Sequence, residues 1–208
     1  MMNRITDYLD ELFPDPKCEL IYSKDYELLI AIVLSAQSTD RQVNKVTEFL
    51  FQKYPSIKSL GEAEIHDLER IIRPIGSFHK KALYVKEIAN KLVNEYDGIV
   101  PRDRELLLQF PGVGRKTINV FFSEFYKEAC FAVDTHVSRV LKRLGVAKNN
   151  DNVYIIEKKA MRKFLKEEWG KRHLQIVLFG RYYCKAIKPS CKDCKLVDIC
   201  NEKKKTLI

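Results

Sequence analysis

The chain has 208 residues, of which 46% are hydrophobic and 31% are charged. This composition is typical of a folded protein and excludes an intrinsically disordered one. The longest purely apolar run, Leu28 to Leu34, has seven residues, whereas a membrane-spanning helix needs about 20, so a transmembrane protein is excluded. Acidic residues near the N-terminus argue against a signal peptide. We therefore expect a cytoplasmic protein, associated with the nucleoid in a bacterium.

Apolar residues recur at helical spacing along most of the chain, and no segment shows the sustained alternation of a strand. Proline, glycine and polar residues mark the ends of the apolar stripes. The pattern predicts an all-α fold of about ten helices. In chain order, the predicted helices cover about 5–13, 26–34 (apolar on all sides, hence buried), 43–50, 65–72, 85–96, 101–109 with Pro101 in its first turn, 115–126, 137–144 capped by Gly145, 164–169 and 174–182.

The chain is basic, with 37 Lys and Arg against 28 Asp and Glu and a net charge of +9. A basic domain is a candidate partner for a polyanion such as nucleic acid, although charge alone is weak support. The segment Pro-Gly-Val-Gly-Arg-Lys, between two predicted helices, could bind a phosphate. Gly112 and Gly114 allow a tight turn, and its amides, with the following helix N-terminus, would attract an anion. The alternative is a plain helix–helix turn, and the two readings are about equal.

Lys116 and Asp134 are candidate catalytic residues. A lysine attacks carbon only as the neutral amine. The helix N-terminus and Arg115 beside Lys116 both favour that form. From the local sequence alone, a phosphate contact is the better interpretation of Lys116, and an N-cap role is the better interpretation of Asp134.

Four cysteines cluster near the C-terminus in the pattern Cys-x6-Cys-x2-Cys-x5-Cys. In the absence of an export signal, such a cluster predicts a metal site and not disulfides. Four thiolates could hold a zinc ion or an iron–sulfur cluster. Lys185, Lys188 and Lys192 in the same region could contact phosphates, or could be ordinary solvated lysines. The cysteines are Cys184, Cys191, Cys194 and Cys200.

Several motifs in one order resemble the helix-hairpin-helix, Gly/Pro–Asp superfamily of base-excision DNA glycosylases, and most of all its endonuclease III family. The resemblance covers nearly the whole chain. Its motifs are Leu-Ser-Ala-Gln-Ser-Thr-Asp (34–40), Ile-Gly (75–76) with Lys-Lys-Ala (80–82), Leu-Leu-Gln-Phe-Pro-Gly-Val-Gly-Arg-Lys-Thr (107–117), Val-Asp-Thr-His-Val (133–137) and Gly-Arg-Tyr-Tyr-Cys (180–184).

The resemblance implies a DNA glycosylase with abasic-site lyase activity, acting on oxidised pyrimidines such as thymine glycol. Lys116 would attack the anomeric carbon and form a Schiff base, with Asp134 assisting. Gln37 would enter the space left by the displaced base, and Gly112, Val113, Gly114 and Arg115 would contact DNA. The four cysteines would hold a [4Fe-4S] cluster.

The resemblance also implies two helical lobes: a six-helix domain over 18–128, and an iron–sulfur domain formed by 1–17 and 129–208. The expected partner is duplex DNA with damaged bases or abasic sites, and the expected state is a monomer. The sequence departs from the family at Ser77, where the family places a bulky wedge; Phe78 could replace it.

Two alternatives differ in function. One is a glycosylase of the same fold for mismatched or other damaged bases. Lys116 argues against the branches that lack this lysine, and the short chain argues against adenine-mispair enzymes, which carry an added C-terminal domain. The other is a non-catalytic iron–sulfur DNA-binding protein, which would not need Lys116.

Overall fold

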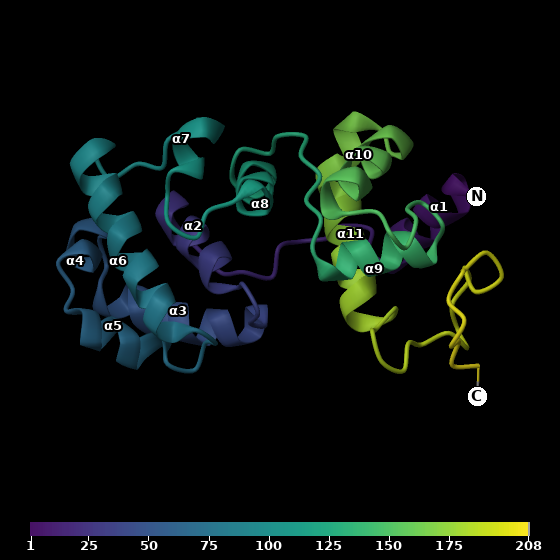
Figure 1. Ribbon diagram of the computed structural model, residues 1–208, viewed down its shortest axis with the longest axis horizontal. Helices are drawn as coiled ribbons and strands as arrows, with labels where there is room; N and C mark the ends of the chain where they lie inside the picture. The colour runs from purple at the N-terminus through teal and green to yellow at the C-terminus, as the bar shows by residue number, and fades with distance from the viewer. Residues whose placement is uncertain (208) are drawn as a thin grey trace. The chain divides into compact units, whose positions relative to one another are not determined.

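The computed structural model describes residues 1–207, and in this range it contains helices and no strand (Figure 1). This confirms the predicted all-α fold. None of the helices in these residues is long and apolar enough to cross a membrane. The helices are α1 (Met2–Leu12), α2 (Asp25–Leu34), α3 (Asp40–Lys53), α4 (Ile57–Gly61), α5 (Ile65–Ile72), α6 (Phe78–Glu95), α7 (Arg104–Leu108), α8 (Arg115–Phe125), α9 (Thr135–Arg143), α10 (Val153–Lys163), the 3-10 helix η1 (Lys166–Glu168) and α11 (Trp169–Tyr182).

The chain divides into two compact units, which we describe separately. The central unit is Cys18–Phe121, and the terminal unit combines Met1–Lys17 with the chain from Phe122 onward. The boundary falls inside α8, earlier than the end of the 18–128 range expected for the six-helix domain.

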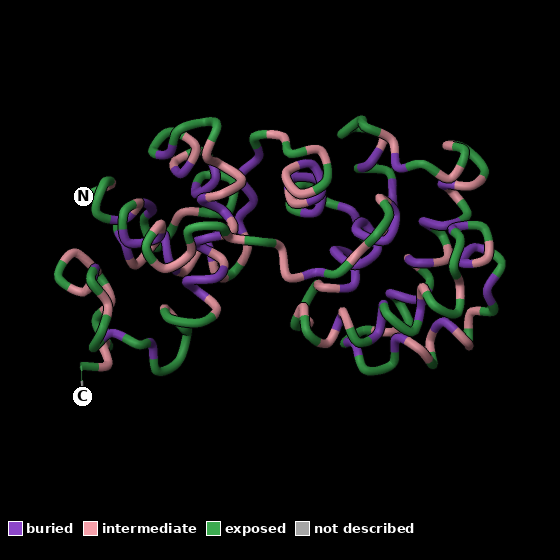
Figure 2. Tube along the Cα trace, turned by 180° about the vertical axis from the view of Figure 1, so that it is seen from behind, coloured by how far each residue is buried: buried purple, intermediate pink, exposed green. Residues whose placement is uncertain are grey.

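The central unit is built around α2, whose residues from Tyr26 to Leu34 are all buried. Helices α3 and α6 pack against α2, and α4 and α5 pack against α6. A helix that is apolar on every side has to be covered by neighbours on every side, as the sequence predicted for this segment. The tube in Figure 2 shows buried segments facing the inside of each unit and exposed segments at the turns.

In the terminal unit, α11 packs against both α1 and α9, and α10 packs against α9. Asp10 of α1 forms ion pairs with Lys171 at 2.7 Å and Arg172 at 2.8 Å. Burial raises the pKa of Asp10, but hydrogen bonds from Lys171, Gln175 and Arg172 outweigh this and lower it to about 2. The N-terminal helix is therefore attached to the C-terminal half by charge as well as by apolar packing.

Several details differ from the prediction. The predicted helix over 164–169 is wrong, because Phe164 and Leu165 are extended, and only the short η1 separates them from α11. Helix α6 begins at Phe78, seven residues before the predicted start. Helix α7 begins at Arg104 and not near Pro101, because the Asp103 side chain caps it by accepting from the amides of Glu105 and Leu106 at 2.8 and 3.0 Å. Helices α4 and α10 were not predicted as separate elements. Gly145 adopts a φ of +72° directly after Leu144, the C-cap residue of α9, which confirms the predicted stop.

Candidate functional site

The segment that joins α7 to α8 is a tight hairpin turn in the central unit. Gly112 has a φ of +74°, and a Cβ at this position would lie 2.7 Å from Cδ2 of Tyr84. Only glycine fits at position 112 without strain, which confirms the reason for predicting it there. The reason is wrong for Gly114, which has no positive φ and open space around it. The expectation that all turn amides point outward is wrong at Val113: its N–H donates to the Phe110 carbonyl at 3.1 Å, and its side chain is buried. Gly112, Gly114 and Arg115 are exposed.

The two glycines of the hairpin make a matched pair for a stability test. In Gly112→Ala the new methyl group would meet the ring of Tyr84 in a strained backbone, so we expect the free energy of unfolding to fall by about 1–3 kcal/mol. In Gly114→Ala a Cβ meets nothing within 4 Å, and we expect a change below about 0.5 kcal/mol. Urea denaturation would measure both. Equal stability of the two variants would contradict this account of the turn.

Lys116 is the second residue of α8, and its side chain is exposed. The next three residues, Thr117 to Asn119, are buried and anchor the helix. The side chain of Arg104 donates to Oδ1 of Asn119 at 2.9 Å, which links α7 to α8 across the hairpin. The amine therefore lies in the first turn of a helix that is anchored to the core.

Asp134 is the N-cap of α9 in the terminal unit, which confirms its N-cap interpretation. Its Oδ1 accepts from the Val137 amide at 2.7 Å. The side chain is half-buried. Because one oxygen is fixed by the cap, the carboxylate has a defined orientation and a second oxygen that can serve another group.

Gln37 lies in the turn between α2 and α3, and its side chain is exposed. Its φ is +57°, in the left-handed region that a glutamine rarely adopts. Ser77, which precedes α6, has a φ of +58°. Phe78 is half-buried and lies against the ring of His79, with ring centroids 3.9 Å apart. The segment that departs from the family pattern thus begins with a strained residue and continues with an aromatic pair.

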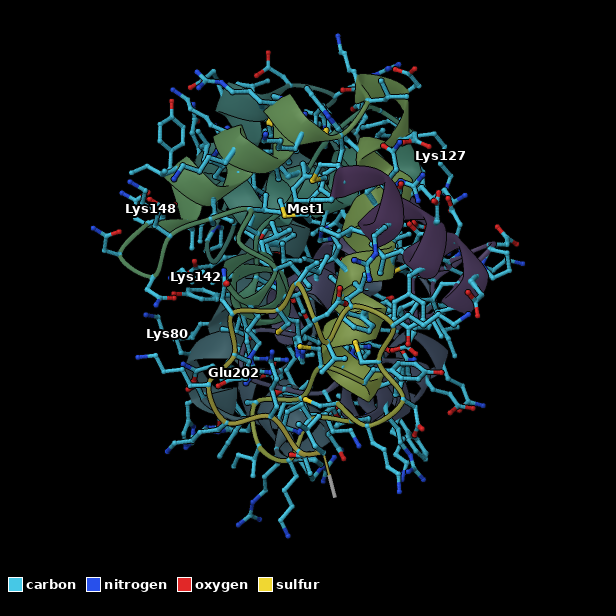
Figure 3. The ribbon with its side chains drawn as sticks, turned by 90° about the vertical axis from the view of Figure 1, so that its right-hand side faces the viewer. Met1, Lys80, Lys127, Lys142, Lys148 and Glu202 are labelled. Carbon is cyan, nitrogen blue, oxygen red and sulfur yellow. The ribbon has the colours of Figure 1, made fainter. Side chains whose placement is uncertain are left out.

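The four cysteines of the cluster line one cavity in the terminal unit. Arg143 of α9 donates to Sγ of Cys184 at 3.3 Å and to the carbonyl of Lys185 at 2.7 Å. The Glu202 amide donates to Sγ of Cys200 at 3.4 Å; Glu202 is labelled on the C-terminal loop in Figure 3. Burial raises the pKa of the Cys184 thiol, and the Arg143 guanidinium partly offsets this.

This donor set fits a thiolate-bound metal centre. Four cysteines line one cavity, and a guanidinium and a backbone amide donate to the sulfurs of two of them, as groups around a metal-bound thiolate do. Among residues 1–207, no group of three or more His, Cys, Asp or Glu side chains is placed so that it could hold a metal ion. Lys185, Lys188 and Lys192 are exposed on the same loop.

Comparisons with known proteins identify the family. Residues 30–169 match the HhH-GPD superfamily of base excision DNA repair proteins. Endonuclease III of Bacillus subtilis (strain 168) is 43% identical over 96% of this chain and 91% of that protein. The chain belongs to the endonuclease III family. Endonuclease III of a Synechocystis species is 40% identical over 92% of this chain and 88% of its own length. A solved endonuclease III–DNA complex without a covalent bond matches with a TM-score of 0.93 and 44% identity, over 97% of this chain and 96% of that one.

Membership of the endonuclease III family makes this chain a base-excision-repair DNA glycosylase and abasic-site lyase. Sequence reasoning missed Arg143, which contacts the cysteine loop. It quoted Lys81 within a motif but gave it no role; Lys81 belongs to α6, and its amine is buried against the end of α2. Arg143 could be recognised as one of the last residues of the predicted helix. Its contact with Cys184, however, joins residues 41 positions apart. Periodicity does not reveal such contacts.

Proposed function

We propose that this endonuclease III family member removes oxidised pyrimidines from duplex DNA and then cuts the strand, with Lys116 as the nucleophile. The observation that carries the proposal is the position of Lys116: an exposed amine in the first turn of the helix that follows the hairpin. The action would take place at the chromosome, in the cytoplasm of a bacterium.

The reaction begins when the neutral Nζ of Lys116 attacks C1′ of the damaged nucleotide. The bond from C1′ to the base breaks, and the base leaves with the electron pair. Opening of the sugar ring at the C1′–O4′ bond then gives a Schiff base between Lys116 and C1′. Loss of a proton from C2′ expels the 3′ phosphate, which cuts the strand on the 3′ side of the sugar.

Asp134 would assist the first step. Its oriented carboxylate could accept the proton of the Lys116 amine or stabilise the positive charge that develops on the sugar as the base leaves. The N-cap bond to Val137 supports this role, because it fixes the carboxylate before DNA arrives. The two residues belong to different units, and the proposal requires both of them at one nucleotide of the bound DNA.

Duplex DNA would be held from several positions. The backbone amides of Gly112 and Gly114, with Arg115, would bind a backbone phosphate at the N-terminus of α8. Val113 supports the turn from the core. Gln37 would fill the gap left when the damaged nucleotide leaves the stack, which costs less for a damaged base than for a paired one. Lys185, Lys188 and Lys192 would add phosphate contacts.

We propose that the four cysteines hold a [4Fe-4S] cluster. When bound, the cluster would cross-link four points of the C-terminal loop. Arg143 would hold the first ligand by its hydrogen bond to Cys184, and the Glu202 amide would hold the last by its bond to Cys200. Iron and sulfide analysis of anaerobically purified protein decides between a cluster and zinc, and zinc without sulfide would overturn this assignment.

The test of the function is borohydride trapping on a duplex that contains one thymine glycol. Borohydride reduces the Schiff base, so a covalent protein–DNA band is expected. A parallel duplex with a pre-formed abasic site separates the two steps. A band with the abasic site alone would mean that the lyase is right and the lesion class wrong, as for the alternative glycosylases. Failure with both duplexes would favour the non-catalytic DNA-binding protein.

A further inference from the structure

Lys81 is a buried cation that the proposed reaction does not use. It lies one turn into α6, and only 6% of its surface is exposed. Its neighbour Lys80 is exposed and extends outward in Figure 3. The Nζ of Lys81 donates to the carbonyl of Leu34 at 2.9 Å and to the carbonyl of Ala36 at 2.6 Å. The amine is therefore directed at the C-terminal end of α2 and at the turn that follows.

The environment of Lys81 is unfavourable for a charge. Within the described part of the chain its partners are these two carbonyls and no carboxylate. Burial lowers its pKa. The negative end of the α2 dipole compensates in part. Even so, an apolar side chain would be cheaper to bury at this place than an ammonium group without a counter-ion. A buried charge at such a cost suggests a purpose other than stability.

The two carbonyls flank the turn that carries Gln37. The Ala36 carbonyl belongs to the peptide group that joins Ala36 to Gln37. Its hydrogen bond to Lys81 therefore holds this peptide plane in place, and the φ of Gln37 describes the rotation directly after it. That φ is +57°. A left-handed glutamine persists only when its surroundings enforce the conformation. Within this turn, the Ser38 amide also donates to the Ser35 carbonyl at 3.0 Å.

A second strained turn lies beside the first, directly before α6. The backbone amide of Lys81 donates to the carbonyl of Ser77 at 3.1 Å, and Ser77 has a φ of +58°. A Cβ built on Gly76 would lie 3.9 Å from the Gln37 carbonyl, so the two turns lie side by side. The turn that carries Gln37 therefore bonds to the side chain of Lys81, and Ser77 bonds to its backbone amide.

We infer that Lys81 is a positioning residue for base excision, which holds the turn after α2 so that the Gln37 side chain is presented to the opened duplex. This inference rests on the proposed function, because only there does Gln37 fill the gap in the base stack. Lys81 does not touch DNA in this view. It acts through Gln37, and its removal leaves the glutamine in place but free to leave its strained conformation.

A double-mutant cycle tests the inference. The variants are Lys81→Met, Gln37→Ala and the double variant, and the measurement is single-turnover excision of thymine glycol from duplex DNA. We expect each single substitution to slow excision about tenfold. The double variant should be no slower than the slower single one, because both changes remove the same contribution. Independent roles would instead multiply to about a hundredfold, and that result would overturn the inference.

Two controls separate positioning from a general loss of structure. Lys86→Met removes a similar bond from the same helix, the donation of Nζ to the Ala63 carbonyl at 2.8 Å, and should leave excision within about twofold of the wild type. Cleavage of an abasic site in single-stranded DNA has no stack to open, and should also be unchanged in Lys81→Met. If Lys81→Met does not fold, Lys81→Gln keeps an amide donor and should show a smaller loss.

The outcomes distinguish this inference from the proposed function. If the wild type neither excises thymine glycol nor cuts abasic sites, the proposed function fails. If the wild type is active but Gln37→Ala or Lys81→Met excises at the wild-type rate, the role of Lys81 is overturned while the chemistry at Lys116 stands. An equal loss on duplex and single-stranded substrates would show that Lys81 is merely structural.

Discussion

The Lys116→Gln variant is expected to lose strand cutting and borohydride trapping by about a thousandfold or more, because the glutamine amide is not nucleophilic. Folding should be unaffected. Lys116 is exposed on the first turn of α8, and glutamine is a good helix former. Single-turnover cleavage of a duplex with one abasic site measures the loss. Circular dichroism measures the fold.

The binding of this variant to DNA should fall little, since it loses one charge from a basic surface. The matched control is Lys58→Gln, an exposed lysine on α4 of the same unit. It removes the same charge and should cut at the wild-type rate. Cutting that survives in Lys116→Gln would assign the nucleophile to another residue. A loss of binding equal to the loss of cutting would support the simpler role of Lys116 as a phosphate contact.

The features of the fold that were predictable are those with a strong local pattern. The continuous apolar run of α2 and the long stripe of α6 predicted their burial. Helix α4 has only five residues and buries Ile57, Leu60 and Gly61, too short a pattern for periodicity to show. Helix α10 begins with Val153 and Tyr154, both exposed, so its apolar residues do not form one stripe. The N-cap residue Asn152 marks the start of this helix better than its apolar pattern does.

The candidate site was predictable where its residues are close in sequence. The hairpin, the cap at Asp134 and the cysteine spacing are all local features, and the structure gives each a defined conformation. The Lys81 contact joins positions 47 residues apart and depends on how α6 packs against α2. Neither helix alone carries a sign of it. Tertiary contacts of this kind decide how a turn is held, and a pattern in one segment cannot report them.

The Cys191→Ser variant should lose bound iron and become less stable by about 3 kcal/mol or more, since metal binding at such a site is folding energy. That loss corresponds to a fall in Tm of about 6–12 °C. The described chain after Tyr182 contains no further helix. It buries few apolar side chains, among them Cys191 and Leu196. A segment with so little core needs a cross-link to keep one conformation.

Cys130→Ala is the matched control for Cys191→Ser, because Cys130 is buried in the same unit but lies outside the cysteine cavity. It should retain iron and sulfide in full. Full iron in Cys191→Ser would overturn the assignment of this ligand.

The loss of the cluster should also weaken DNA binding, because the loop that carries Lys185, Lys188 and Lys192 would no longer be fixed. If all three contact phosphates, the slope of log affinity against log salt should become shallower by about 2.7, since each contact contributes about 0.9. An unchanged slope would mean that these lysines are solvated and that the cross-linked loop serves the fold of the terminal unit alone.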